Sequence, residues 1–198
     1  MNYKQTVAEI RNLRWERLNA GELQQLMVLS GYAAREFAES LRIARRLHPD
    51  NAQLEEMAAG ELQTDNLRFN DYARRGDHAD FLWQFIDRYG IMKSEEQVSA
   101  VGEAYLDRVR TLDDQTRVMS IASREQELPG IFSRILSASD WNASGLLEFR
   151  YYLKQHILFD TGIGGHGELT RDIPIDDRVD AFYQHRLEMY RVISKLFR

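Results

Sequence analysis

The chain has 198 residues, of which 43% are hydrophobic and 29% are charged, and its formal net charge is −5. This length and composition favour one globular domain over residues 1–198, and the negative charge argues against nucleic acid as the main partner. The absence of cysteine excludes disulfides, thiolate catalysis and zinc–thiolate sites, and it agrees with a cytoplasmic location.

From the N-terminus onward, long segments repeat apolar residues at helical spacing, and β-branched alternation is nearly absent. The first segment, MNYKQTVAEIRNLRWERL, lacks the apolar run of a secretory signal, and no stretch approaches the run of about 20 apolar residues that crosses a bilayer. We therefore expect a soluble protein that does not act at a membrane. Helices are predicted at residues 3–19, 22–47, 51–75, 78–89, 94–112, 116–137, 142–160 and 175–197.

These segments predict an all-α fold, a single helical bundle of seven to eight helices. Pro129 lies inside the sixth predicted helix and should kink it or begin a new helix, because proline lacks the backbone donor.

Ionisable residues interrupt the apolar stripes of the third and fourth predicted helices. In the third helix Leu54 and Met57 share a face with Glu61, and Asp65 follows one turn later. The fourth begins with His78, in line with Phe81 and other apolar residues. Burying such groups is costly unless they are paired, hydrogen-bonded or bound to metal.

The sixth and seventh predicted helices show the same interruption. Glu125 takes an aliphatic position in the sixth, and in the seventh the row that contains Phe149 and Leu153 continues with His156 and Asp160. His156 and Asp160 are four residues apart, so they share a helix face and could converge on one ion.

Each position also fits a structural role. Glu125 could pair with an arginine, His78 could cap its helix, His156 and Asp160 could form a hydrogen-bonded pair, and His166 could lie on the surface. The set as a whole favours a metal site, since bundle cores that gather carboxylates and histidines commonly hold two iron or manganese ions.

The order of a glutamate and a histidine, then REQELPGIF, then YYLKQHILFDTGIGGHGEL, resembles the heme-oxygenase-like diiron oxidases and oxygenases. These enzymes share a fold with heme oxygenase, the TenA thiaminases and the pyrroloquinoline quinone synthase PqqC. The resemblance covers about residues 25–195 and implies a heme-oxygenase-like bundle. It implies six metal ligands, which are Glu61, His78, Glu125, His156, Asp160 and His166.

The match departs from the family pattern at two places. His166 lies six positions after Asp160, whereas the family usually has a step of three or four. The step from Glu61 to His78 is also longer than the family leads us to expect, which leaves Glu39 and Asp65 open as the early carboxylate.

The resemblance implies an enzyme that binds two Fe(II) ions, or manganese, and uses O2 to oxidise a small organic substrate. The reaction would be hydroxylation, N-oxygenation, desaturation or carbon–carbon cleavage. Tyr72, Phe81, Phe85 and Tyr152 are candidates for the substrate pocket, although they are equally suited to a core. The sequence is compatible with a homodimer and does not determine the oligomeric state.

Two alternatives remain from the residues. A metal-free enzyme of the same fold, similar to the TenA or PqqC type, is one, although a TenA-type thiaminase needs a cysteine nucleophile that this chain lacks. A non-catalytic helical binding protein, with its polar residues paired to arginines, is the other.

Overall fold

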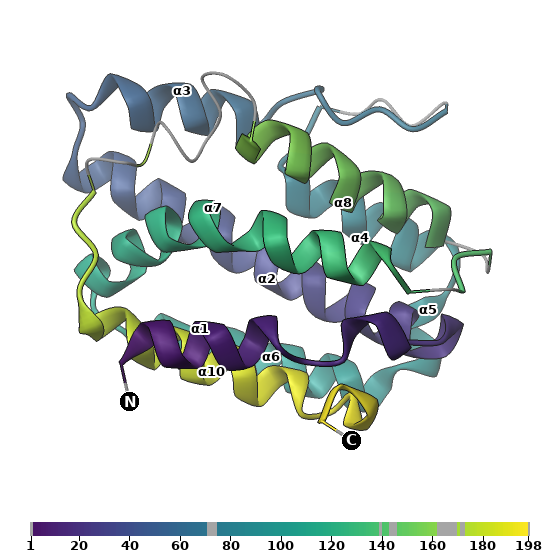
Figure 1. Ribbon diagram of the computed structural model, residues 1–198. Helices are drawn as coiled ribbons and strands as arrows, with labels where there is room; N and C mark the ends of the chain where they lie inside the picture. Colours follow the sequence, from purple (N-terminus) through teal and green to yellow (C-terminus); the bar gives the residue numbers. More distant parts are fainter. Residues whose placement is uncertain are drawn as a thin grey trace.

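The described part of the chain is mainly helical, as the sequence predicts (Figure 1). The computed structural model describes residues 2–70, 75–138, 140–142, 146–161, 170 and 173–197. In these ranges the chain forms nine α-helices, three short 3-10 helices and no strand. The α-helices are α1 (Tyr3–Arg11), α2 (Ala20–Leu47), α3 (Ala52–Glu61), α4 (His78–Arg88), α5 (Ile91–Ser94), α6 (Glu96–Arg110), α7 (Asp114–Leu136), α8 (Leu146–Thr161) and α10 (Asp180–Tyr190). The 3-10 helices are η1 (Trp15–Arg17), η2 (Asp177–Val179) and η3 (Ser194–Phe197).

Short polar side chains set where several of these helices begin. At the start of α2 the Asn19 side chain accepts a hydrogen bond from the Glu22 backbone, and the Glu22 carboxylate accepts one from the Asn19 backbone. Asn51 caps α3 by accepting hydrogen bonds from the backbone amides of Gln53 and Leu54. These bonds satisfy amide groups that have no partner within a first helical turn.

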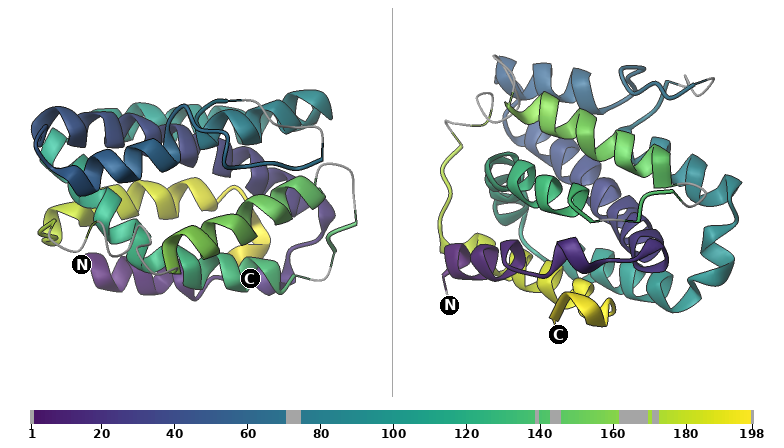
Figure 2. Two further views of the ribbon diagram at one scale, coloured as in Figure 1. Left: turned by 90° about the horizontal axis from the view of Figure 1, so that it is seen from above. Right: turned by 45° about the vertical axis from the view of Figure 1, so that its right-hand side comes forward.

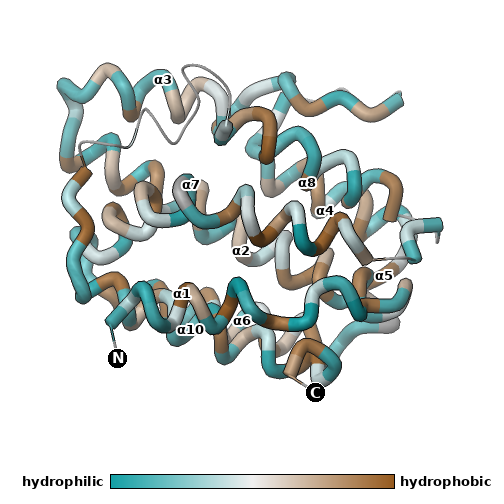
Figure 3. Tube along the Cα trace, viewed as in Figure 1, coloured by the Kyte–Doolittle hydropathy of each residue, from teal (hydrophilic) through white to brown (hydrophobic). Residues whose placement is uncertain are grey.

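Helix α2 is the centre of the bundle and contacts most of the other helices, including α3, α4, α6, α7 and α8. In Figures 1 and 2, α3, α4 and α8 lie on one side of α2 and α7, while α1, α6 and α10 lie on the other. Figure 3 shows hydrophobic and hydrophilic stretches alternating along these helices, as expected where each helix buries one face.

The helices share one large hydrophobic core, in which Trp15, Tyr32, Phe85, Phe149 and Phe182 are among the largest fully buried side chains. A smaller apolar cluster joins α2, α3 and α7. No helix within the described ranges is both long and apolar enough to cross a lipid bilayer.

The predicted helix 3–19 is wrong in its second half. Helix α1 ends at Arg11, Asn12 follows as its C-cap, and only a 3-10 turn continues at Trp15–Arg17. The Trp15 side chain is fully buried and its Nε1 donates to the Ile10 carbonyl at 3.0 Å. Turning the chain back buries this large side chain, which a continued helix would direct elsewhere.

Three other predicted boundaries differ from the structure. The C-terminal segment divides into η2, α10 and η3, and the predicted break at residues 89–96 contains the short helix α5. Helix α7 continues through Pro129, so of the two outcomes expected there, a kink or a new helix, the second does not occur. The side chain of Ser133 donates to the Pro129 carbonyl at 2.8 Å, a local bond within the continuing helix.

We expect Gly102→Ala to lower the free energy of unfolding by about 2–3 kcal/mol, because α2 and α6 approach closely at this glycine. An added Cβ would overlap the ring of Tyr32, which is buried and packs edge-to-face against Trp83 at a centroid distance of 4.9 Å. The matched control is Gly130→Ala in α7, where nothing lies within 4 Å of the new Cβ. There alanine should gain about 0.5–1 kcal/mol, as in any open helix position. Equal effects in urea unfolding would contradict this packing.

Candidate metal centre

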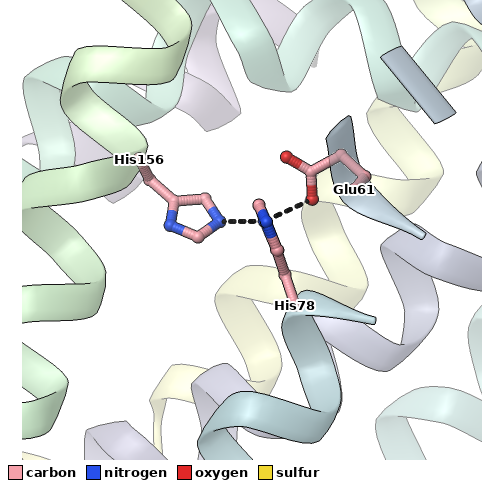
Figure 4. Close-up of side chains that lie close together, drawn as sticks. All are labelled: Glu61, His78 and His156. Carbon is pink, nitrogen blue, oxygen red and sulfur yellow. Dashed lines mark hydrogen bonds and ion pairs between the residues drawn. The ribbon is translucent and has the colours of Figure 1, made fainter. Parts of the chain in front are cut away.

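Three side chains from three different helices meet inside the bundle (Figure 4). Glu61 is the last residue of α3, His78 the first of α4, and His156 lies in α8. The distance from Glu61 Oε2 to His78 Nδ1 is 2.8 Å, and that from His78 Nδ1 to His156 Nε2 is 3.2 Å. One ligand atom from each residue lies within 4.8 Å of the others, and all three residues are buried. We call these residues the Glu–His–His cluster.

A closed loop brings Glu61 and His78 together. Helix α3 ends at Glu61 and not near residue 75 as predicted, because Leu62 is extended and Gln63 adopts a positive φ of 51°. Thr64 and Gly76 then exchange two backbone hydrogen bonds of 2.9 Å in an isolated antiparallel bridge. The bridge closes the loop, so 16 intervening residues separate two side chains that touch.

Asp77 fixes the end of this loop. Its carboxylate accepts a hydrogen bond from the Gln63 backbone at 3.1 Å and forms an ion pair with Arg42 of α2. Asp77 also forms a capping box with Asp80 at the start of α4. These bonds attach both ends of the loop to α2 and α4, which positions His78 at the first turn.

A backbone carbonyl sets the tautomer of His156. Its Nδ1 lies 2.9 Å from the Tyr152 carbonyl oxygen, which can only accept a hydrogen bond. Nδ1 therefore carries the proton in the neutral ring, and the lone pair lies on Nε2, which faces the cluster.

Asn66 sets the tautomer of His78 in the same way. The Asn66 Nδ2 donates to the Gly60 carbonyl at 2.8 Å, which orients the amide and directs its Oδ1 to His78 Nε2 at 2.7 Å. His78 Nε2 must then donate, so in the neutral ring the lone pair lies on Nδ1, the atom between Glu61 and His156.

The cluster therefore brings together the lone pairs of two imidazoles and one carboxylate. These groups repel one another unless a positive charge lies between them. Two ligands of one ion, each roughly 2.1 Å from it, are about 3.0 Å apart at octahedral angles and about 3.4 Å apart at tetrahedral angles. The distances of 2.8 and 3.2 Å are close to these spacings. A proton on His78 Nδ1 would also supply a positive charge, and both Glu61 and His156 Nε2 lie close enough to accept it.

The cluster faces a cavity that contains two further predicted ligands. Glu125 of α7 and Asp160 of α8 are buried and line the same cavity as the cluster. The cavity has a volume of about 50 Å³, compared with roughly 10–15 Å³ for one water molecule. Sulfur is absent from this donor set, and nitrogen with carboxylate oxygen suits iron and manganese, and also zinc.

Tyr152 lines the cavity beside the cluster and stays protonated. Burial raises the pKa of its phenol well above the ordinary value, and the nearby carboxylates of Glu61 and Asp160 raise it further. Its hydroxyl is therefore a neutral hydrogen-bond donor at any physiological pH.

The tight grouping differs from the one that the helical spacing suggested. His156 and Asp160 do lie on one buried face of α8, yet His156 groups with Glu61 and His78, whereas Asp160 lines the cavity outside that cluster. The reason is the loop closure between α3 and α4, which spacing along a single helix cannot express.

The two alternative early carboxylates lie outside the cavity. Glu39 binds Arg110 at 2.6 Å and Arg117 at 3.2 Å; although partial burial raises its pKa, these arginines bring it below the ordinary value. Asp65 is exposed and pairs with Arg68 at 2.6 Å, because α3 ends before it. Of the three candidates for the early carboxylate, Glu61 is therefore the one that belongs to the Glu–His–His cluster.

The predicted pocket residues divide in a similar way. Tyr152 lines the cavity, whereas Phe85 is fully buried core and Phe81 lines a smaller neighbouring cavity. Phe81 packs edge-to-face on Phe85 at a centroid distance of 4.8 Å, which holds it away from the main cavity. Tyr72 and His166 lie outside the described residues.

Two residues of the site have no counterpart in the sequence-based prediction. Asn66 lies in the loop, and nothing in TDNLRFND distinguishes it from a surface asparagine. Arg186 lines the cavity from α10, where it interrupts an apolar row of Phe182 and Tyr190 at spacings of four. The pattern that singled out Glu125 could therefore have found Arg186.

Asn66→Ala is expected to weaken binding of Mn(II) about 10- to 100-fold, the usual effect of losing a group that orients a metal-bound histidine. Without Asn66, His78 can rotate and carry its proton on Nδ1, in competition with the metal. Dissociation constants from calorimetric titration of the metal-depleted protein measure the effect. Asn12→Ala, at an exposed helix end without a side-chain hydrogen bond in the described structure, should bind Mn(II) as the parent does. Equal affinities in the two variants would show that Asn66 does not orient His78 for a metal.

Comparison of the chain with models of protein families, with characterised proteins and with solved structures finds no match.

Proposed function

We propose that this protein is a non-heme diiron enzyme that uses O2 to oxidise a small organic substrate. The observation that carries the proposal is the Glu–His–His cluster. Hydrogen bonds of the two imidazoles to Asn66 Oδ1 and to the Tyr152 carbonyl leave the other ring nitrogen of each facing into the cluster, beside the Glu61 carboxylate. Bound ferrous ions would supply the electrons that reduce O2.

The order of ligands along the chain also supports the proposal. The resemblance to heme-oxygenase-like diiron enzymes pointed to Glu61, His78, Glu125, His156 and Asp160, and all five line one cavity. They come from four helices, so their meeting is not a consequence of neighbouring positions in the sequence.

The residues that line the cavity would bind the metal ions and hydrogen-bond to a bound molecule. Glu61, His78 and His156 would hold one ion, and Glu125 with Asp160 would hold the second from across the same cavity. The carboxylates would balance the charge of the ions. The neutral phenol of Tyr152 could donate a hydrogen bond to a group bound in the cavity.

The substrate space would be formed by the apolar remainder of the cavity. Its lining includes Ala33, Ala34 and Phe37 from α2 and Leu128 and Phe132 from α7. Such a wall excludes water and suits a small, largely apolar molecule. Leu128 and Phe132 are partly buried where they line this space, and Phe132 also packs against the main hydrophobic core.

The metal-free alternative rests on the short contact between His78 and Glu61. If His78 carried two protons, its Nδ1 would donate to Glu61 across 2.8 Å, and the cluster would be a buried ion pair. A cavity enzyme without metal, or a binding protein, would then fit the same fold.

Anaerobic reconstitution with Fe(II) separates these functions. We expect about two iron ions per chain after removal of excess metal, and O2 uptake faster than that of the same Fe(II) in buffer. Glu125→Gln should retain about one iron, because Glu125 lies outside the Glu–His–His cluster, whereas Glu39→Gln, away from the cavity, should retain two. A parent protein that retains no iron, or that does not accelerate O2 uptake, would refute the proposal.

A further inference from the structure

Among the described residues, one buried cation of the cavity wall forms no ion pair. Arg186 of α10 is 7% exposed and lines the cavity that contains the candidate metal ligands. Its Nε donates to the Tyr190 hydroxyl at 3.2 Å. Within the part of the chain that the structure describes, its buried Nη1 has no hydrogen-bond partner, and no carboxylate forms an ion pair with it.

Arg124, the other arginine of the same wall, shows what a compensated cation looks like. Its Nη1 lies 2.6 Å from Glu36 Oε2, and its Nε and Nη2 donate to Ser120. Its guanidinium also lies over the rings of Phe37 and Phe182. Arg124 therefore has a counterion and a hydrogen bond at each of its three nitrogens. Arg186 has no such counterion in the described structure and could receive a ligand.

Arg186 also keeps its charge. Burial alone would lower its pKa, but Tyr190, Tyr105 and Glu36 nearby raise it above the ordinary value of an arginine. A buried guanidinium without an anion is costly, so the fold retains an unfavourable charge at this place. A bound anion would remove that cost.

Tyr190 adds a second donor. Its hydroxyl accepts from Arg186 Nε and lines the cavity, so its own proton can be donated to a bound anion. The apolar residues Ala33, Phe37 and Leu128 line the same cavity. The small cavity and the planar fork of arginine favour a carboxylate over a phosphate.

We propose that Arg186, with Tyr190, binds the carboxylate of a small substrate whose apolar body lies in the cavity. The inference rests on the proposed function, because bound cations would offset Glu61, Glu125 and Asp160, which otherwise repel an anion. Arg186 would be a substrate-binding residue that sets specificity for acids over neutral molecules.

Two probes of equal size and different charge test this inference. Hexanoate and hexanamide are titrated calorimetrically into the Mn(II)-loaded protein, so that the readout is binding and not turnover. We expect hexanoate to bind at least tenfold more tightly than hexanamide. Arg186→Met, which retains much of the apolar stem, should remove this preference by weakening the binding of hexanoate more than that of hexanamide. The manganese content should not change.

Further arms separate the alternative explanations. Arg45→Met, at an exposed arginine of α2, should keep the preference for hexanoate. Arg186→Met should unfold at the same or a higher temperature than the parent, because it removes an uncompensated buried charge; a clear loss of stability would indicate a structural role and overturn the inference. Equal affinities of the parent for hexanoate and hexanamide would also overturn the inference. So would a preference for hexanoate that persists in Arg186→Met, because the carboxylate would then bind elsewhere.

Failure of the proposed function gives a different result. If the parent binds no manganese, the proposed diiron function is refuted independently of the carboxylate site. The same titrations are then made on the metal-free protein. A preference for hexanoate that depends on Arg186 would still support the carboxylate site, and its absence would end that proposal as well.

Discussion

Replacing His156 by alanine is expected to lower the affinity for Mn(II) or Fe(II) at least 100-fold. His156 supplies one of the three clustered ligand atoms, and its lone pair faces His78 Nδ1 at 3.2 Å because the Tyr152 carbonyl holds the ring proton on the other side. Loss of a ligand should exceed the roughly 10- to 100-fold effect of losing a group that only orients one.

Thermal unfolding with and without metal measures this effect. At a metal concentration 100 times the dissociation constant of the parent, binding should stabilise the parent by about 2.7 kcal/mol. The same concentration should stabilise a variant with 100-fold weaker binding by about 0.4 kcal/mol. Without metal, His156→Ala should itself lower stability, because the buried ring packs against Tyr152, Phe132 and Phe159. The stabilisation gained on adding metal is therefore compared within each variant.

The matched control is His48→Ala, at an exposed histidine that ends α2 away from the cavity. This variant should gain the full stabilisation from metal. If His156→Ala is stabilised by metal as strongly as His48→Ala, the cluster does not bind the ion.

Glu36→Gln is expected to lower the free energy of unfolding by about 3–5 kcal/mol, since breaking a buried ion pair leaves the other charge without compensation. Glu36 and Arg124 are each 1% exposed, and their charged atoms lie 2.6 Å apart. Glu36 also accepts hydrogen bonds from Ser40 and Tyr105, so the loss reaches beyond one contact.

An exposed pair of the same length provides the control. Glu55 and Arg45 lie 2.6 Å apart, but both side chains are largely exposed to solvent. Glu55→Gln should therefore cost less than about 1 kcal/mol. Chemical denaturation of both variants makes the comparison, and similar losses would mean that the Glu36–Arg124 pair is not buried as described.

The Glu36–Arg124 pair also bears on the chemistry of the cavity. Because Glu36 neutralises Arg124, that arginine is not available to a ligand, whereas Arg186 is. In Glu36→Gln the freed Arg124 would add a second cation to the cavity wall. Hexanoate binding by a folded sample of this variant should therefore be retained or strengthened.

Much of the helical architecture could be predicted from the sequence because it follows from local patterns. The rows that place Glu61, His78, Glu125, His156 and Asp160 among apolar residues are visible at spacings of three and four, and the structure buries all five. The polarity of these positions on buried faces was enough to select them. Where a large side chain acts across a turn, as Trp15 does, local periodicity fails.

Amphipathic spacing is a property of a single helix, so the order of residues is sufficient to predict which helix faces turn inward and which charged residues those faces carry. Which of these residues touch depends on how the helices and loops pack against one another. The Thr64–Gly76 bridge joins Glu61 to His78, and Asn66 and the Tyr152 carbonyl orient the two imidazoles. These contacts join residues of different helices and loops, so no pattern along one element could contain them. For the same reason the sequence does not reveal the role proposed for Arg186. That role depends on a cavity that forms only when the helices pack, and on a guanidinium nitrogen that has no hydrogen-bond partner in the described part of that cavity.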